Sequence, residues 1–227
     1  MLFPSLGALL LATSVVAQDL SEFTGTWSSG SGKVITGPNF ADPSEAAFKY
    51  PDVAGISYSF TESGYFELAR YRFISNGSEP NCIRGVLGWL HGTWEVLSNT
   101  SIVMTPIWGD GYQQIQDPCG ANSNFVENYN GTEIYSTYAF STDAADGRRR
   151  FQLFEHNGVP LPPMFLISET PTMLPTNKLR NVSAPATVDK NKRELGSESG
   201  SGDRVNVADK AAVVLSMAAL GLSSLLI

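Results

Sequence analysis

The chain of 227 residues is 42% hydrophobic, 16% charged and 11% aromatic, a composition that suits one globular domain with appendages and leaves no room for a two-domain enzyme of ordinary size. The charge density is too low for a disordered chain, and the net charge of −7 disfavours nucleic acid, whose phosphates need a clustered basic surface. Two cysteines exclude a disulfide-dense miniprotein and a four-thiolate metal site.

Residues 1–17 predict a secretory signal peptide. The stretch is apolar and uncharged, and Val15 and Ala17 suit signal peptidase, so we expect cleavage after Ala17. The positive region that usually begins a signal peptide is reduced to the amino terminus. A buried helix of the mature fold is the alternative. We expect the chain to enter the secretory pathway.

Residues 18–180 predict an all-β luminal domain. No long run has helical spacing, and short β-branched and aromatic segments alternate with Gly, Pro, Asn and Asp. Because open sheet edges invite aggregation, we expect an antiparallel, barrel-like domain, with a β-sandwich as the alternative. A repeated Gly-Thr-Trp, at 25–27 and 92–94, is similar to the first strand of lipocalin-like and avidin-like barrels. The expected strands are 56–61, 65–74, 86–97, 101–107, 112–116, 133–141, 150–156 and 164–168.

The sequence contains no recognisable catalytic or metal-binding constellation. In the strand expected at 86–97, His91 lies on the polar side of the alternation, which predicts a surface position. His156 lies at the end of an expected strand, before a turn, which also predicts a surface position. There is no Gly-x-Ser-x-Gly motif and no third ligand cluster. We therefore expect no catalysis, no metal and no cofactor. Four acids could face a cleft as glycosidase carboxylates or form ion pairs with arginines: Glu67, Glu95, Asp110 and Glu133.

The two cysteines, Cys82 and Cys119, are predicted to form a disulfide because the compartment is oxidising. This disulfide would close a loop of roughly 40 residues and stabilise the domain by about 4 kcal/mol through chain entropy. A redox-active role is the alternative, but it would need Cys-x-x-Cys spacing or a thiolate of low pKa.

Four sequons without an intervening proline predict N-glycosylation. Three lie at expected turns and the fourth begins a polar segment, so all are placed where a transferase reaches them. The acceptors are Asn76, Asn99, Asn130 and Asn181.

Residues 159–175 combine apolar side chains with prolines, which disfavour pairing inside a sheet. Such a segment either wraps the domain and covers a sheet edge, or presents an apolar groove to other polypeptides. Composition alone favours the first interpretation.

The C-terminal part predicts a tether and a membrane anchor. Residues 181–210 are rich in Ser, Gly and charges, with five acids balancing five bases, and predict a flexible polar tether. Residues 211–227 are uncharged and apolar, and predict a C-terminal membrane helix. A transmembrane anchor and the signal for a lipid (GPI) anchor remain open alternatives, since small residues at 199–202 precede the apolar run.

Four long segments resemble the fungal Rot-one family, named for reversal of Tor lethality. They are FTGTWSSGSGKVITGPNFADP, GISYSFTESGYFELARYRFISN, GDGYQQIQDPC and LFEHNGVPLPPMFLISETPTMLPT. The resemblance covers about residues 22–180 and includes both cysteines. No catalytic residue of the family can be transferred to this chain.

The resemblance implies a single-pass type I protein of the endoplasmic reticulum membrane that helps secretory proteins fold, and that is needed for cell-wall β-1,6-glucan and, through its clients, for lysis of autophagic bodies. We therefore expect an ATP-independent chaperone, not an enzyme, whose partners are folding secretory glycoproteins and cell-wall synthesis proteins. One alternative is a β-glucan-binding or remodelling protein, and another is a structural subunit of a glucan-synthesis complex. The rings and the carboxylate that could serve the first are Trp89, Trp94, Trp108, Tyr112 and Asp110. The candidate client surface is Pro160, Leu161, Phe165 and Leu166.

Overall fold

The computed structural model describes residues 20–182, so the expected signal peptide, the anchor at 211–227 and almost all of the tether lie outside the described residues. One turn of 3-10 helix, η1 (Ser21–Phe23), precedes thirteen strands whose pairing is antiparallel. The expected antiparallel all-β domain is therefore confirmed. The strands are β1 (Gly25–Ser29), β2 (Ala41–Asp42), β3 (Ala47–Phe48), β4 (Gly55–Phe60), β5 (Tyr65–Asn76), β6 (Glu79–Val96), β7 (Ile102–Pro106), β8 (Tyr112–Gln116), β9 (Asn124–Asn128), β10 (Glu133–Tyr135), β11 (Thr137–Thr142), β12 (Arg149–Phe154) and β13 (Met164–Ser168).

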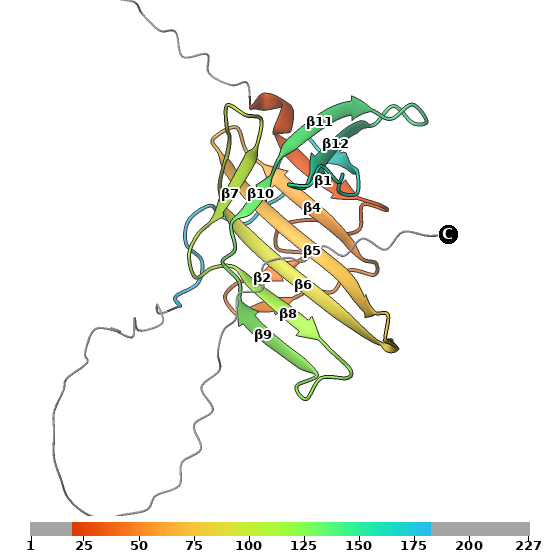
Figure 1. The fold of residues 1–227 in the computed structure, drawn as a ribbon. Coiled ribbons are helices and arrows are strands. Elements are labelled where there is room, and N and C mark those ends of the chain that lie inside the picture. Colours follow the sequence, from red (N-terminus) through yellow and green to blue (C-terminus); the bar gives the residue numbers. More distant parts are fainter. Residues whose placement is uncertain (1–19, 183–227) are drawn as a thin grey trace, which may run out of the picture. The chain divides into compact units, whose positions relative to one another are not determined.

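Eleven of these strands form one branched sheet, and β2 and β3 pair separately. The main path runs β10-β7-β6-β5-β4-β1-β13-β12-β11. The branch exists because β6 is long: its residues 92–96 pair with β7, whereas its residues 85–89 pair with β8, which in turn pairs with β9. Figure 1 shows β7 and β10 at one end of β6 and the β8–β9 hairpin at the other.

The two ends of the main path meet without closing a ring. β10 and β11 are consecutive in the chain and are separated by Ser136, whose N–H donates to the carbonyl of Phe154 and whose carbonyl accepts from Ser101 Oγ. The sheet is therefore curled, but the order of paired strands is open. The expected closed, lipocalin-like barrel is not confirmed.

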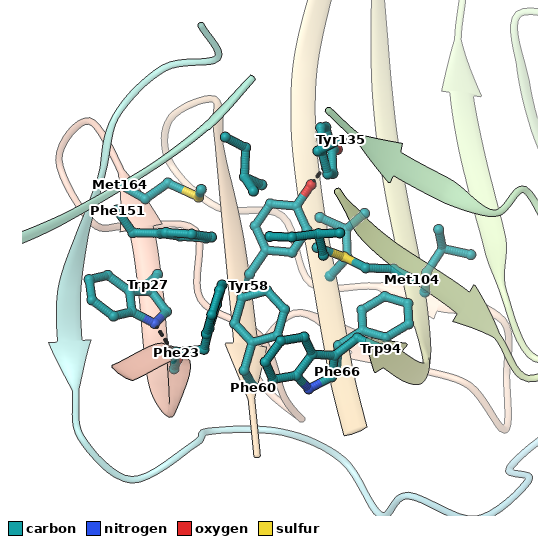
Figure 2. Close-up of a cluster of buried hydrophobic side chains, with 14 residues drawn as sticks. Phe23, Trp27, Tyr58, Phe60, Phe66, Trp94, Met104, Tyr135, Phe151 and Met164 are labelled. Carbon is teal, nitrogen blue, oxygen red and sulfur yellow. Dashed lines mark hydrogen bonds between the residues drawn. The ribbon is translucent and has the colours of Figure 1, made fainter. Parts of the chain in front are cut away.

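The inner face of the curled sheet encloses an aromatic core, shown in Figure 2. Trp27 and Trp94, one from each Gly-Thr-Trp, are 0% and 4% exposed, and Phe23 contacts Trp94 with ring centroids 4.8 Å apart. In the second motif Gly92 is required, because a Cβ there would lie 2.0 Å from the carbonyl oxygen of Thr105 in β7. The repeated tripeptide therefore supplies both tryptophans of one core. Its other buried members are Tyr58, Phe60, Phe66, Leu68, Leu90, Ile102, Met104, Tyr135, Phe151, Leu153 and Met164.

A second core lies on the outer face of β5, β6 and β8. Alternate residues of a strand point to opposite faces, so Ala69, Leu87 and Trp89 face away from the inner core. They are covered by the segment between β1 and β4, which contributes residues such as Phe40, and by residues 170–182, which contribute Leu174 and Leu179. The proline-containing C-terminal segment thus packs over the outer face of the sheet.

Candidate functional site

The inner face carries a hollow beside the aromatic core, which we call the inner hollow. Its volume is about 250 Å³, and Arg70 and Arg72 of β5 form its floor together with an apolar rim. The same two arginines border a smaller depression next to it, over Val86 and Gly88 of β6. The hollow is lined by Ile56, Arg70, Arg72, Glu133, Ile134, Tyr135, Glu155 and Leu161.

A network of tyrosines and one ion pair fixes the floor of the inner hollow. Arg70 Nη2 lies 3.0 Å from Glu133 Oε1, and both side chains are largely buried. Tyr135 OH donates to Glu133 Oε2 at 3.0 Å, and the hydroxyls of Tyr58 and Tyr135 lie 2.7 Å apart. Burial raises the pKa of Tyr58 to about 12, so this hydroxyl stays protonated at neutral pH. Each of these polar side chains has a partner within the network, which suits a binding surface better than proton transfer.

Arg72 gives the inner hollow a second guanidinium, which forms no ion pair within the described residues although the charge of Glu133 acts on it. It follows Arg70 on the same face of β5, and no carboxylate forms an ion pair with it among residues 20–182. Burial, and then repulsion by Arg70, lowers its pKa from the ordinary value. Arginine stays charged even so. The hollow therefore combines an available guanidinium with apolar side chains, of which Ile134 is 61% exposed.

The predicted client residues are divided between two places. Leu161 lines the inner hollow, and Pro160, which is exposed, bridges to Phe154 at its margin. Phe165 and Leu166 belong to β13, which pairs with β1 and β12, although prolines nearby had argued against pairing inside the sheet. Phe165 is half-buried under the guanidinium of Arg148, 4.2 Å from its ring centroid.

Two buried acids on the outer face bind the segment 172–180, which we call the C-terminal strap. Glu67, 0% exposed, accepts hydrogen bonds from the backbone N–H groups of Gly37 and Leu174, both at 2.5 Å. Burial raises the pKa of Glu67 to about 7, and these donors oppose that rise. The carbonyl of Thr172 accepts from Thr36 and Ser59. Proline in the strap prevents it from pairing with a strand through its backbone. Hydrogen bonds between side chains and the backbone of the strap take the place of that pairing.

Asp110 binds the other end of the strap. It is 0% exposed, and its carboxylate accepts from the backbone N–H groups of Leu179 at 2.6 Å and Arg180 at 2.8 Å. The third partner is His91 Nε2, at 2.8 Å. The Arg180 guanidinium adds a bond to Asn128 Oδ1 at 3.1 Å. The carboxylate thus joins β6, the turn before β8 and the strap.

The prediction that His91 is a surface residue is wrong. The imidazole is 1% exposed, and burial lowers its pKa even though Asp110 works to raise it. Its Nδ1 has no hydrogen-bond partner, which fits a neutral ring that is protonated on Nε2 and donates to Asp110. The strap covers this face of β6. The alternation of polar and apolar residues within β6 does not reveal that a distant segment buries its polar side.

Most of the groups considered for glucan binding are buried. Trp89 and Tyr112 are 0% exposed, in the outer core with Asp110 beside them, and Trp94 is in the inner core. Trp108, 47% exposed, is the one ring of this set that lies at the surface. Stacking of a sugar on a row of aromatic rings therefore has little support in the described residues.

The cysteines and the sequons lie at the margins of the domain. Cys82 and Cys119 form a disulfide that joins the start of β6 to the turn between β8 and β9. Asn76 ends β5 at a hairpin turn and Asn99 lies in the turn before β7, both exposed. Asn130 is half-buried, and its Oδ1 accepts from the N–H of Gly109 at 2.8 Å. Asn181 is exposed at the end of the described chain.

Within residues 20–182 no group of three or more His, Cys, Asp or Glu side chains is placed to hold a metal ion. The same range contains no helix long and apolar enough to cross a membrane. The four acids considered as glycosidase carboxylates do not form a facing pair. Glu67 and Asp110 accept hydrogen bonds from backbone N–H groups. Glu133 forms an ion pair with Arg70, and Glu95 is exposed.

Comparison with known proteins agrees with the resemblance. A family model described as "Rot1: Chaperone for protein-folding within the ER, fungal" matches residues 23–225. A protein named "Protein rot1" from Aspergillus niger is 40% identical over 205 residues, covering 90% of this chain and 84% of its own length. Its namesake from Schizosaccharomyces pombe is 44% identical over 155 residues, covering 68% and 67%. No solved structure matches the chain.

Proposed function

The chain belongs to the Rot1 family of fungal chaperones for protein folding within the endoplasmic reticulum, and from this premise we propose that it is an ATP-independent folding factor for secretory glycoproteins. The family match over residues 23–225 carries the proposal. The sequence has no phosphate-binding glycine loop, so client binding and release would proceed without nucleotide. We propose further that the chain acts without catalysis.

The site of action in this proposal is the luminal side of the endoplasmic reticulum membrane. The apolar sequence at 1–17 supports secretion, and the apolar sequence at 211–227 supports a type I transmembrane anchor, with a GPI anchor as the alternative. We also propose that the need for β-1,6-glucan and for lysis of autophagic bodies, implied by the family resemblance, arises because enzymes of these processes are clients.

The proposed client residues are Pro160, Leu161, Phe165 and Leu166, and we centre the proposed client surface on the inner hollow, which Leu161 lines, whereas Phe165 and Leu166 lie apart from the hollow in β13. Two features support this centre. Leu161 gives an apolar rim, the strongly exposed Ile134 lies where the inner hollow adjoins a second hollow, and Arg72 offers charge to an acidic or carbonyl group of the client. An unfolded segment that carries an apolar side chain next to a polar one could contact the apolar rim and Arg72 at the same time.

Replacing the exposed rim residue tests this surface. Ile134→Ser should weaken binding of an unfolded glycoprotein several-fold, measured by fluorescence anisotropy, because it removes apolar area from the rim. The fold should tolerate the change, since Ile134 is 61% exposed. Val53→Ser is the matched control, because Val53 is 43% exposed and does not line the hollow. Equal binding by both variants and the unmodified protein would place client binding elsewhere.

A further inference from the structure

Strand β9 is the free end of the branch in the sheet. It pairs with β8 on one side, and no other strand of residues 20–182 pairs with it. Figure 1 shows β9 as the outermost strand of the β8–β9 hairpin. The ends of the main path differ, since β10 and β11 meet at Ser136. Among the described strands, β9 therefore presents an open edge, whereas the other two end strands adjoin at Ser136.

Hydrogen bonds on both flanks of β9 show which of its backbone groups point outward. Beyond its end, the N–H of Tyr129 donates to the carbonyl of Gly111 at 2.9 Å, and before its start, the carbonyl of Ser123 accepts from Asp117 at 2.9 Å. Along an antiparallel strand, the backbone N–H and C=O groups of successive residues point alternately toward the partner strand and away from it. The odd-numbered residues from 123 to 129 therefore bond to β8. The N–H and C=O groups of Asn124, Val126 and Asn128 consequently point to the open edge.

The edge has few of the features that normally prevent strand addition: it is short and carries one acid, Glu127, which accepts a hydrogen bond from Gln113. Residues 124–128, Asn-Phe-Val-Glu-Asn, contain no proline and no lysine, and the β8–β9 pairing has no bulge. Val126 is 44% exposed at the centre of the strand. On the inner face the register aligns Phe125 with Ile115 and then with Val86, which borders the depression beside the inner hollow. An added strand would extend this apolar row.

We propose that the open edge of β9 binds an extended segment of an unfolded client by β-strand addition, an inference that rests on the proposed chaperone function. The occupant is a proline-free stretch with apolar side chains at alternate positions, one face of which continues the row Val86, Ile115 and Phe125. Backbone hydrogen bonds carry the affinity in this mode, and every polypeptide has the same backbone. Strand addition therefore explains how one domain accepts many sequences without nucleotide.

Two variants at Val126 separate backbone recognition from side-chain recognition. Val126→Pro removes the outward N–H at the centre of the edge and leaves the bonds to β8 in place. Val126→Ala removes most of the side chain and keeps that N–H. With the full chain in detergent and a short alternating valine–threonine peptide ending in lysines as probe, we expect affinity to fall about tenfold for Val126→Pro and less than about twofold for Val126→Ala.

An equal loss of peptide affinity in both variants would overturn strand addition and indicate that the side chain of Val126 makes an apolar contact. Unchanged affinity in Val126→Pro, with its circular dichroism preserved, would also overturn it. A copy of the peptide with alternate N-methyl groups should not bind, and tight binding of that copy would contradict the proposal. If the unmodified protein forms a dimer that Val126→Pro dissolves, the edge serves a second copy instead. If the unmodified protein binds no unfolded glycoprotein at all, the proposed chaperone function fails. That result differs from a failure of strand addition alone, in which the unmodified protein still binds the glycoprotein.

Discussion

Asp110→Ala is expected to lower the free energy of unfolding by about 3–5 kcal/mol, because it leaves buried donors without an acceptor. The carboxylate accepts from His91 Nε2 and from the N–H groups of Leu179 and Arg180, and it is itself 0% exposed. None of these groups gains water while the strap stays in place. The expected fall in melting temperature is about 10 °C, measurable by thermal and urea unfolding.

Two controls identify the cause of this loss. Asp52→Ala removes an exposed acid and should change stability by less than about 0.5 kcal/mol. Asp110→Asn retains one acceptor oxygen and should fall between Asp110→Ala and the unmodified protein. Limited proteolysis should cut Asp110→Ala within the strap sooner than Asp52→Ala. A loss below about 1 kcal/mol in Asp110→Ala would show that the strap bonds are dispensable.

The double variant Cys82→Ser, Cys119→Ser is expected to lose about 4 kcal/mol, because the disulfide closes a loop with a sequence separation of 37 residues. The loss acts mainly through the unfolded chain, which gains freedom when the loop opens. In the folded state the bond fastens the turn after β8 to the start of β6. Urea unfolding measures the loss, and faster amide exchange in β8 and β9 than in β4 should accompany it.

Reduction of the unmodified protein provides the matched comparison for the double variant. Its urea midpoint in dithiothreitol should agree with that of the double variant, since both lack the same cross-link. If oxidised and reduced protein unfold within about 0.5 kcal/mol of each other, the disulfide has no structural role and the redox-active alternative gains support.

The strand pattern of the domain was largely predictable from the sequence. The expected strands at 112–116 and 164–168 coincide with β8 and β13, because alternating residues there lie between clear turn signals. The strand expected from 86 begins at Glu79 instead, since the exposed half of a long hairpin has no apolar periodicity. β9 was missed for a related reason. An edge strand of five mostly exposed residues carries no two-residue alternation.

The buried polar sites were not predictable because their partners are distant in the chain. Glu67 bonds to Leu174, 107 residues away, and Asp110 bonds to Arg180, 70 residues away, both through backbone N–H groups that leave no signal in residue identity. The same strap buries His91, which local alternation had placed at the surface. An ion pair with an arginine was one of the alternatives for the four acids, and Glu133 forms one with Arg70, but the sequence did not indicate which acid would pair with which arginine.

The most direct test of the central claim is light scattering of an unfolding glycoprotein mixed with the full glycosylated chain in detergent, without ATP. An ATP-independent folding chaperone should suppress aggregation near stoichiometric ratios, and Ile134→Ser should suppress it less well than Val53→Ser. Absence of suppression by a chain shown by circular dichroism to be folded, with the Cys82–Cys119 disulfide intact, would contradict a general folding role and point to a dedicated partner or a glucan ligand.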